Sequence, residues 1–189
     1  MDKIIFLDID GVISTPRTIK DGMWGLTDDC QYRLGTIITE TNAKIVLSSS
    51  WRLNTVETTK EYMQQHGFLF CNDIIGVTIR GYHYIIKGSS LPIPRGVEIK
   101  QWIDTHLVYP WHAYPDRKES WTERNADGSF KIMRHQRLYE HYNYLILDDD
   151  TDMLLEHKDH FINCDGMIGL TDEEVIKAIE ILNSDTKAI

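Results

Sequence analysis

The stretch Lys3–Val12, KIIFLDIDGV, decides the fold. Ile4–Leu7 is a short apolar run of the kind that forms a strand buried on both faces of a parallel sheet. Asp8 and Asp10 follow directly, and Gly11 then permits a tight turn that brings backbone close to a ligand. The pattern therefore predicts a buried strand that ends in two carboxylates.

Two later segments repeat this arrangement of an apolar strand followed by polar residues. Lys44–Leu47 precedes the sequence SSSWR at Ser48–Arg52, and Tyr144–Leu147 precedes the sequence DDDTD at Asp148–Asp152. Ligands of open α/β sheets bind outside the carboxyl ends of the strands. If the three strands are neighbours, we expect the three polar clusters to meet at one site.

Helices are predicted between these strands. Thr27 suits the N-cap of a helix that stops at Asn42. Asn54 and Glu57 fit the N-cap and N3 positions of a capping box, and that helix is expected to end at Gly67.

The second half of the chain carries two further helical patterns. The spacing of Ile99, Trp102, Ile103 and His106 predicts a helix over residues 97–106. The last helix is expected to open on a capping box between Thr171 and Glu174. Its buried apolar face is expected to consist of Val175, Ile176, Ile179 and Leu182.

Further extended segments complete the alternation of strands and helices. Phe68–Cys71 and Phe161–Cys164 are predicted to be strands. Residues 74–79 and 82–86 are predicted to be extended pieces of a hairpin around Arg80-Gly81. Short apolar strands that alternate with helices indicate an α/β fold with a mainly parallel sheet.

Composition and charge exclude several classes of protein. The chain has 189 residues, 42% of them hydrophobic, and 29 acidic against 20 basic residues give a net charge of −9. This balance excludes a generally basic nucleic-acid binder. We see no membrane span and no signal peptide, and three widely spaced cysteines with no metal spacing favour reduced thiols in a cytoplasmic protein.

The expected convergence of polar clusters would crowd at least three carboxylates together, which like-charge repulsion opposes. A divalent cation resolves that repulsion, and Mg²⁺ suits a site that offers carboxylates, waters and a substrate phosphate. Ser48 and Ser49 offer hydroxyl and backbone N–H groups for phosphate oxygens. The pattern thus indicates a magnesium site beside a phosphate site.

The quoted motifs resemble those of a known superfamily. FLDIDGVI, IVLSSSWR and ILDDDTDM resemble motifs I, II and IV of the haloacid dehalogenase (HAD) superfamily. SSSWR, together with Arg95-Gly96-x-Glu98-Ile99, is most similar to the HAD domain of Swiss Army Knife RNA-repair proteins and its stand-alone phage and bacterial relatives. The resemblance covers residues 3–106 and 143–183, and it implies a Rossmann-like three-layer sandwich with a minimal cap. We expect residues 1–189 to form one such domain, located in the cytoplasm or, for a phage protein, in the host cytoplasm.

The resemblance also implies a reaction, the hydrolysis of a phosphomonoester by an HAD-type phosphatase. Asp8 would be the nucleophile that forms an aspartyl-phosphate, and Asp10 the general acid and base. Asp8 and the backbone carbonyl of Asp10 would bind Mg²⁺, Asp148 or Asp149 would supply the remaining carboxylate, and Asp152 would orient the site.

The phosphoryl group needs partners of its own. Either Ser49 or Ser48 would hydrogen-bond it, and Gly11 would shape the adjoining turn. The cation that neutralises it is expected to be Arg95, with Lys87 next in order and Arg52 as a third choice.

Two segments are candidates for choosing the substrate. Residues 14–43 have room for one helix but for no separate cap, whereas residues 53–94 have room for a small one. Residues 107–142 form an insertion whose stretch 111–141 carries six basic and five acidic residues beside several aromatic rings. Aromatic rings next to basic residues suit the binding of nucleobases and phosphates. The alternative is that these rings only pack the insertion onto the core. The residues predicted to choose the substrate are Trp111, Arg117, Trp121 and Arg134.

Three functions remain open at this point. The first is a phosphatase of a nucleotide or of a nucleic-acid terminal phosphate. The second is a phosphatase of another small metabolite such as a sugar phosphate. The third is a catalytically idle binding module, against which the intact Asp8 and Asp10 pair argues.

Overall fold

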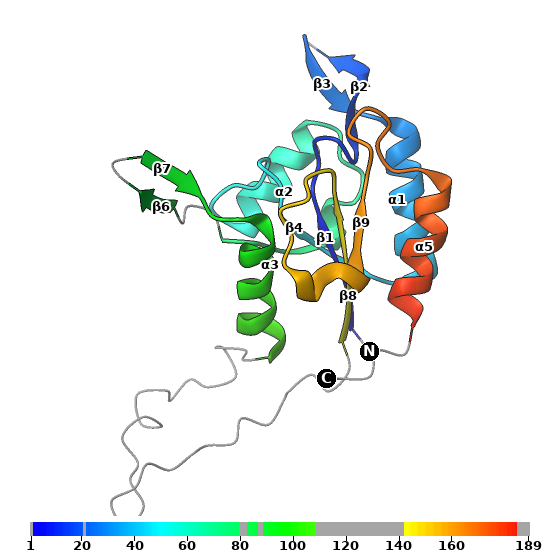
Figure 1. Ribbon diagram of the computed structural model, residues 1–189. Helices are drawn as coiled ribbons and strands as arrows, with labels where there is room; N and C mark the ends of the chain where they lie inside the picture. The colour runs from blue at the N-terminus through cyan, green and yellow to red at the C-terminus, as the bar shows by residue number, and fades with distance from the viewer. Residues whose placement is uncertain (1, 21, 80–82, 87–88, 109–141, 185–189) are drawn as a thin grey trace, which may run out of the picture.

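A computed structural model of the chain describes residues 2–20, 22–79, 83–86, 89–108 and 142–184. Among these residues, five strands form one parallel sheet in the order β5-β4-β1-β8-β9 (Figure 1). The strands are β1 (Asp2–Leu7), β4 (Lys44–Leu47), β5 (Ile74–Val77), β8 (Tyr142–Asp148) and β9 (Phe161–Asn163). The strands that precede the three polar clusters, β1, β4 and β8, are neighbours, which confirms the expected arrangement.

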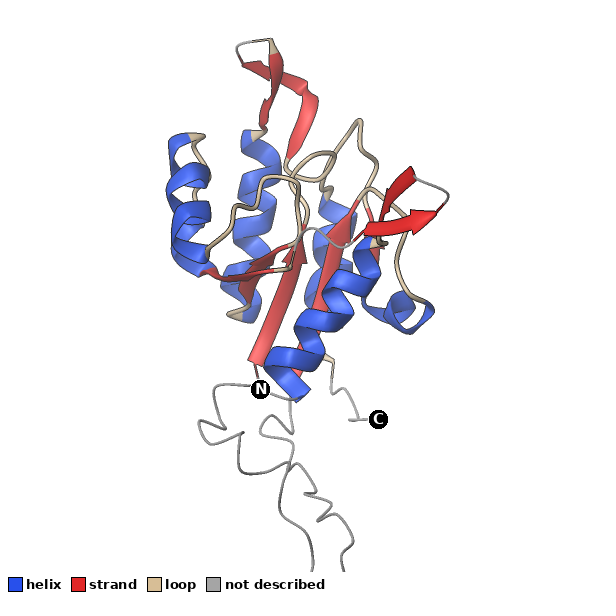
Figure 2. Cartoon of the chain, turned by 90° about the vertical axis from the view of Figure 1, so that its left-hand side faces the viewer, coloured by secondary structure: helices blue, strands red, loops and turns tan. Residues whose placement is uncertain are grey.

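Side chains of β1 alternate between two apolar cores, one on each face of the sheet. Ile5 and Leu7 point into a core shared with helices α1 (Asp28–Thr41), α2 (Val56–Gln65) and α5 (Asp172–Asn183). Ile4 and Phe6 point into a second core shared with α3 (Arg95–Ile103). Figure 2 shows helices on both sides of the strands. The fold is therefore the predicted three-layer α/β sandwich, with one strand buried on both faces.

The helix ends follow from local sequence. Thr27 occupies the N-cap of α1, and Asn42 ends that helix in the left-handed conformation at φ 55°. A capping box between Thr171 and Glu174 opens α5. These three features confirm the predictions. Ile176, predicted to be buried, is instead 60% exposed, because the buried face of α5 is formed by Val175, Ala178 and Leu182 and position 176 lies off that face.

The start of α2 differs by one residue from the prediction. The capping box joins Thr55 and Thr58, whose hydroxyls and backbone N–H groups pair reciprocally, and not Asn54 and Glu57. The two pairs have the same spacing and both suit a helix start, so the pattern alone did not separate them. Gly67 follows the helix with φ 87°, as expected of a residue just past a helix end.

The segment Phe68–Cys71 is not a strand. Its backbone donors are used by the neighbouring helices and not by a sheet, since Phe68 N–H donates to Met63 O of α2 and Leu69 N–H donates to the Gln31 side chain of α1. A short 3₁₀ helix follows (Cys71–Asp73), and the strand that pairs with β4 is β5.

The predicted hairpin around Arg80-Gly81 is also wrong. Strand β6 (His83–Ile86) pairs antiparallel with β7 (Ser89–Pro92), so the two strands are joined through residues 87–88. β5 belongs to the central sheet instead. Pro92 and Pro94 obscured β7 in the sequence, because proline is tolerated only at the edge of a sheet.

A second hairpin rises beyond the carboxyl edge of the sheet, formed by β2 (Ser14–Lys20) and β3 (Met23–Leu26) (Figure 1). Arg17 anchors it, because its guanidinium donates to the Asp29 carboxylate at 3.0 Å and to Ile168 O at 2.6 Å. Residues 14–43 were predicted to hold only a helix, so this hairpin is an addition to the predicted fold.

Helix α3 begins two residues earlier than predicted, at Arg95, and continues as one π-helical turn, Asp104–Val108. Trp102 packs edge-on against Phe6, with ring centroids 5.4 Å apart. This contact fixes α3 on the sheet and so fixes Arg95 at its N-terminal end. No helix in the described part of the chain is long and apolar enough to cross a membrane.

Candidate active site

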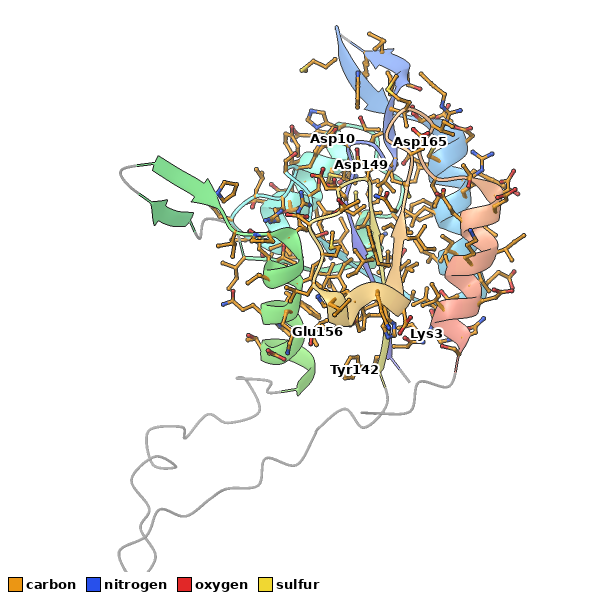
Figure 3. The ribbon with its side chains drawn as sticks, in the orientation of Figure 1. Lys3, Asp10, Tyr142, Asp149, Glu156 and Asp165 are labelled. Carbon is orange, nitrogen blue, oxygen red and sulfur yellow. The ribbon has the colours of Figure 1, made fainter. Side chains whose placement is uncertain are left out.

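The three polar clusters meet at the carboxyl edge of the sheet. The ladder extends one residue past each strand, because Asp8 N–H donates to Leu147 O at 2.9 Å and Ser48 N–H donates to Leu7 O at 3.0 Å. Figure 3 shows Asp10 and Asp149 at this end of the sheet and Tyr142 at the opposite end. Residues more than 100 positions apart in the sequence therefore share one site.

A cluster of three carboxylates lies at its centre. Oxygen atoms of Asp8, Asp148 and Asp149 all lie within 4.8 Å of one another. Asp8 is 5% exposed and Asp148 is fully buried. Burial, followed by the charge of Asp8, raises the pKa of Asp148 to about 7, and burial raises the pKa of Asp8 as well. The cluster thus concentrates negative charge at the carboxyl edge of the sheet.

Arg95 is the cation next to this cluster in the described part of the chain. Its Nη1 lies 3.4 Å from Asp8 Oδ1 and 3.7 Å from Asp148 Oδ2, and it also donates to Ser48 O. The Asp152 carboxylate accepts from the backbone N–H of Arg95 at 2.7 Å and so holds the start of α3 against the site. This geometry is compatible with the predicted roles of Arg95 as the cation beside the phosphoryl group and of Asp152 as a residue that orients the site.

Arg52 has partners other than the three clustered aspartates. Its buried guanidinium forms an ion pair with Glu98 and donates to Thr78 O at 3.1 Å. It also donates to the backbone oxygens of Ser48 and Ser49, and so braces the loop after β4. Lys87 lies outside the described residues, as do Trp111, Arg117, Trp121 and Arg134.

The two serines differ in their surroundings. Ser49 hydrogen-bonds the Asp8 carboxylate and thereby lowers its pKa, against the larger effect of burial. The Ser48 hydroxyl is buried and has no hydrogen-bond partner among the described residues. Ser49 is therefore the serine that stands beside the carboxylate cluster.

Asp10 is held by Trp51, which was not among the predicted site residues. Trp51 Nε1 lies 3.0 Å from both Oδ1 and Oδ2 of Asp10, and Ser50 Oγ lies 3.3 Å from Oδ2. The one feature of the sequence that could have indicated this role is the position of Trp51 directly after Ser48–Ser50, because an indole N–H there can donate a hydrogen bond to a group of the site.

Two glycines make room for the Asp149 carboxylate. A Cβ on Gly11, whose φ is +74°, would lie 2.1 Å from Asp149 Oδ2, and a Cβ on Gly166 would lie 2.6 Å from the same atom. Gly166 was missed, although Asp165-Gly166 follows a predicted strand. Glycine at both positions keeps the carboxylate close to the backbone.

Gly11→Ala is expected to destabilise the fold by about 1–3 kcal/mol, through left-handed backbone strain and displacement of Asp149. Urea unfolding measures this loss. Gly67→Ala is the matched control, because Gly67 also has positive φ but open space around its Cβ position. Equal losses for the two variants would show that the Asp149 contact has no energetic role.

Comparison with known families places most of the chain in a described family. The family described as "HAD domain in Swiss Army Knife RNA repair proteins" matches residues 4–136. The chain belongs to this family. No curated protein and no solved structure matches the chain.

Membership supports a hydrolase of the phosphatase kind in the setting of RNA repair. Enzymes of the HAD superfamily generally use Mg²⁺, and the residues present fit that ion. Oδ2 of Asp148 is buried without a hydrogen-bond partner in the described part of the chain, and the donor set consists of carboxylate oxygens. Mg²⁺ prefers such oxygen ligands.

Proposed function

We propose that the protein is a Mg²⁺-dependent phosphomonoester hydrolase that works through an aspartyl-phosphate intermediate. The observation that carries the proposal is the cluster of Asp8, Asp148 and Asp149, with Asp10 two residues beyond Asp8 at the end of the same strand. A carboxylate nucleophile beside a second carboxyl group supplies both the attacking group and the proton donor for phosphoryl transfer.

The reaction proceeds in two displacements. An Asp8 oxygen attacks phosphorus and forms the aspartyl-phosphate bond, while the bond between phosphorus and the leaving oxygen breaks and protonated Asp10 gives that oxygen its proton. Asp10, now a carboxylate, then takes a proton from a water molecule that attacks phosphorus. The phosphate leaves and the Asp8 carboxylate is restored.

Asp8, Asp148, Asp149 and the backbone carbonyl of Asp10 are the groups proposed to hold Mg²⁺. When bound, the ion neutralises the carboxylates and the charge of the transferring phosphoryl group. Arg95 and Ser49 are the proposed protein partners of the phosphoryl oxygens, and Asp152 positions Arg95 through its backbone.

A nucleotide or the terminal phosphate of a nucleic acid is the proposed substrate, since the family occurs in RNA repair. A sugar phosphate is the alternative. In this proposal the chain is one cytoplasmic domain, and residues 53–94 and 107–142 remain candidates for substrate contacts.

Release of phosphate from p-nitrophenyl phosphate, with and without Mg²⁺, tests the reaction. A panel of mononucleotides, 3′- and 5′-phosphorylated oligonucleotides and sugar phosphates then tests the substrate class. Turnover of sugar phosphates in preference to nucleotides contradicts the nucleic-acid assignment, and no turnover of any phosphomonoester contradicts the enzyme.

Asp148→Asn tests the metal site without measuring activity. In chelator, the variant is expected to unfold about 2–4 °C above the wild type, a gain of roughly 1 kcal/mol, because the neutral amide removes a charge that burial disfavours. On Mg²⁺ addition, the wild type is expected to gain stability while the variant binds the ion roughly tenfold or more weakly. Calorimetric scans measure both; equal Mg²⁺-induced shifts would contradict the assignment of Asp148 as a ligand.

A further inference from the structure

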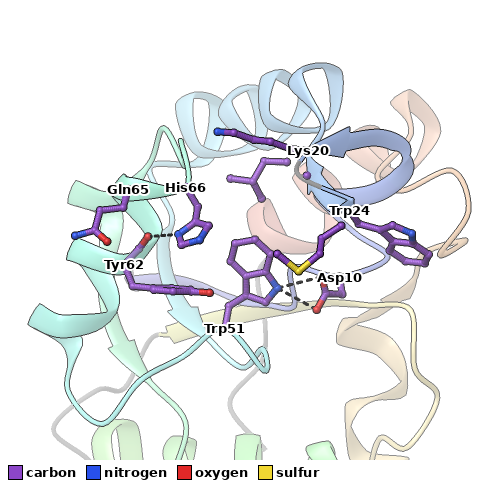
Figure 4. Close-up of a pocket in the computed structure, with 10 residues that line it drawn as sticks. Asp10, Lys20, Trp24, Trp51, Tyr62, Gln65 and His66 are labelled. Carbon is purple, nitrogen blue, oxygen red and sulfur yellow. Dashed lines mark hydrogen bonds between the residues drawn. The ribbon is translucent and has the colours of Figure 1, made fainter.

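A cavity of about 600 Å³ opens beside Asp10, between the β2–β3 hairpin and helix α2 (Figure 4). Asp10 and Trp51 contribute from the active-site loops. The hairpin contributes Lys20, Met23 and Trp24 among others, and the helix region contributes Tyr62, Gln65 and His66. A cavity of this size is within the range of about 300–1,000 Å³ found for small-molecule sites.

Four of its ten lining residues carry aromatic rings: Trp24, Trp51, Tyr62 and His66. Tyr62 and His66 lie with ring centroids 4.2 Å apart, and Trp51 meets them edge-on at 5.9 and 5.4 Å. On the hairpin side, Trp24 is 42% exposed and Met23 is 69% exposed. Exposed apolar side chains gathered around a cavity are typical of a ligand site, because burying them against a ligand is favourable.

The cavity lies on the Asp10 side of the reaction centre. Asp10 lines it, and the Trp51 indole that donates to the Asp10 carboxylate forms part of its wall (Figure 4). In the proposed reaction, Asp10 protonates the leaving oxygen. A group that occupies the cavity is therefore the leaving group and not the phosphoryl group.

We propose that this cavity binds the nucleobase of a nucleoside whose phosphate is the one hydrolysed. The proposal rests on the function proposed above and names the part of the substrate that the site recognises. Flat aromatic walls suit a base because every base offers a π-face for stacking. Gln65 can both donate to and accept from a base edge, and Lys20 adds a positive charge at the rim.

The competing occupants fit this chemistry less well. The sugar of a sugar phosphate can set a face of C–H groups against Trp24 or Tyr62, but it has no π-face for stacking and no planar edge with ring nitrogens for Gln65. A phenyl ring, as in phosphotyrosine, stacks but offers no hydrogen-bonding edge to Gln65 and fills less of the volume. A purine or pyrimidine satisfies both the aromatic and the polar parts of the lining.

The kinetic test compares AMP with ribose 5-phosphate, which differ in the presence of the base. The wild type is expected to favour AMP in kcat/KM by roughly 5- to 150-fold, the gain that stacking of one base provides. Trp24→Ala is expected to lower this ratio at least fivefold, mainly through KM, and Trp24→Phe to restore most of it. Tyr32→Ala, an exposed aromatic residue outside the cavity, is the matched control and leaves both rates unchanged.

Binding of adenosine separates failure of this proposal from failure of the proposed function. Adenosine carries no phosphate, so quenching of tryptophan fluorescence reports on the cavity even if no substrate is hydrolysed. Binding that Trp24→Ala weakens supports the proposal whether or not the protein is active. Hydrolysis of both phosphates at equal kcat/KM, a preference for phosphotyrosine over AMP, or absence of adenosine binding overturns it.

Discussion

Asp8→Asn is expected to lose on the order of 10⁴-fold or more in kcat for every phosphomonoester. An amide oxygen is a poor nucleophile and forms no stable phosphorylated intermediate, so both displacements fail. The geometry makes the loss specific, because Asp8 is buried next to Arg95 and to the carboxylates of the proposed metal site. Phosphate release under saturating Mg²⁺ measures the effect.

The fold of this variant is expected to remain intact. Removing one of three crowded carboxylates relieves repulsion, so the melting temperature in chelator should not fall. Asp159→Asn, at an exposed aspartate away from the cluster, is the matched control and should keep full activity. If Asp8→Asn retained more than about a tenth of the activity, a covalent route through Asp8 would be excluded.

Asp10→Asn is expected to lose about 10²- to 10⁴-fold in kcat/KM on alkyl phosphates such as nucleotides. The loss should be clearly smaller on p-nitrophenyl phosphate, because nitrophenolate departs without a proton. kcat/KM is the parameter to compare, since it reports the first phosphoryl transfer and not the later hydrolysis of the intermediate.

The same comparison distinguishes an acid from a purely structural residue. Asp10 holds the Trp51 indole and the Ser50 hydroxyl, and disruption of that network alone would slow both substrates equally. Trp51→Phe serves as the control, because it removes the indole donor but leaves the Asp10 carboxyl group in place. Equal losses on both substrates in Asp10→Asn would contradict general acid catalysis.

The sequence predicted those parts of the fold that depend on local signals. Apolar runs that end in polar residues identified β1, β4 and β8, and capping residues such as Thr27 and Thr171 identified helix starts. The central carboxylates followed from the same runs, because parallel strands end at one edge of the sheet.

The parts that the sequence did not predict depend on contacts between distant segments. The β2–β3 hairpin is held by Arg17 on Ile168 O, a contact across 151 positions that no window of sequence contains. Phe68–Cys71 has strand-forming residues, but its amides find partners in α1 and α2. Trp51 and Gly166 matter only through where they touch Asp10 and Asp149.

Substitution of Trp51 cannot change the substrate preference of the protein without also affecting catalysis. Its indole contributes a wall of the cavity and also holds the Asp10 carboxylate, so replacing it alters recognition and proton transfer together. Trp24 and Gln65 line the cavity only, since neither forms a hydrogen bond with the active-site aspartates in the described part of the chain. New specificities in this protein are therefore more accessible through the hairpin and the outer face of α2, which gives directed evolution a defined set of positions to vary.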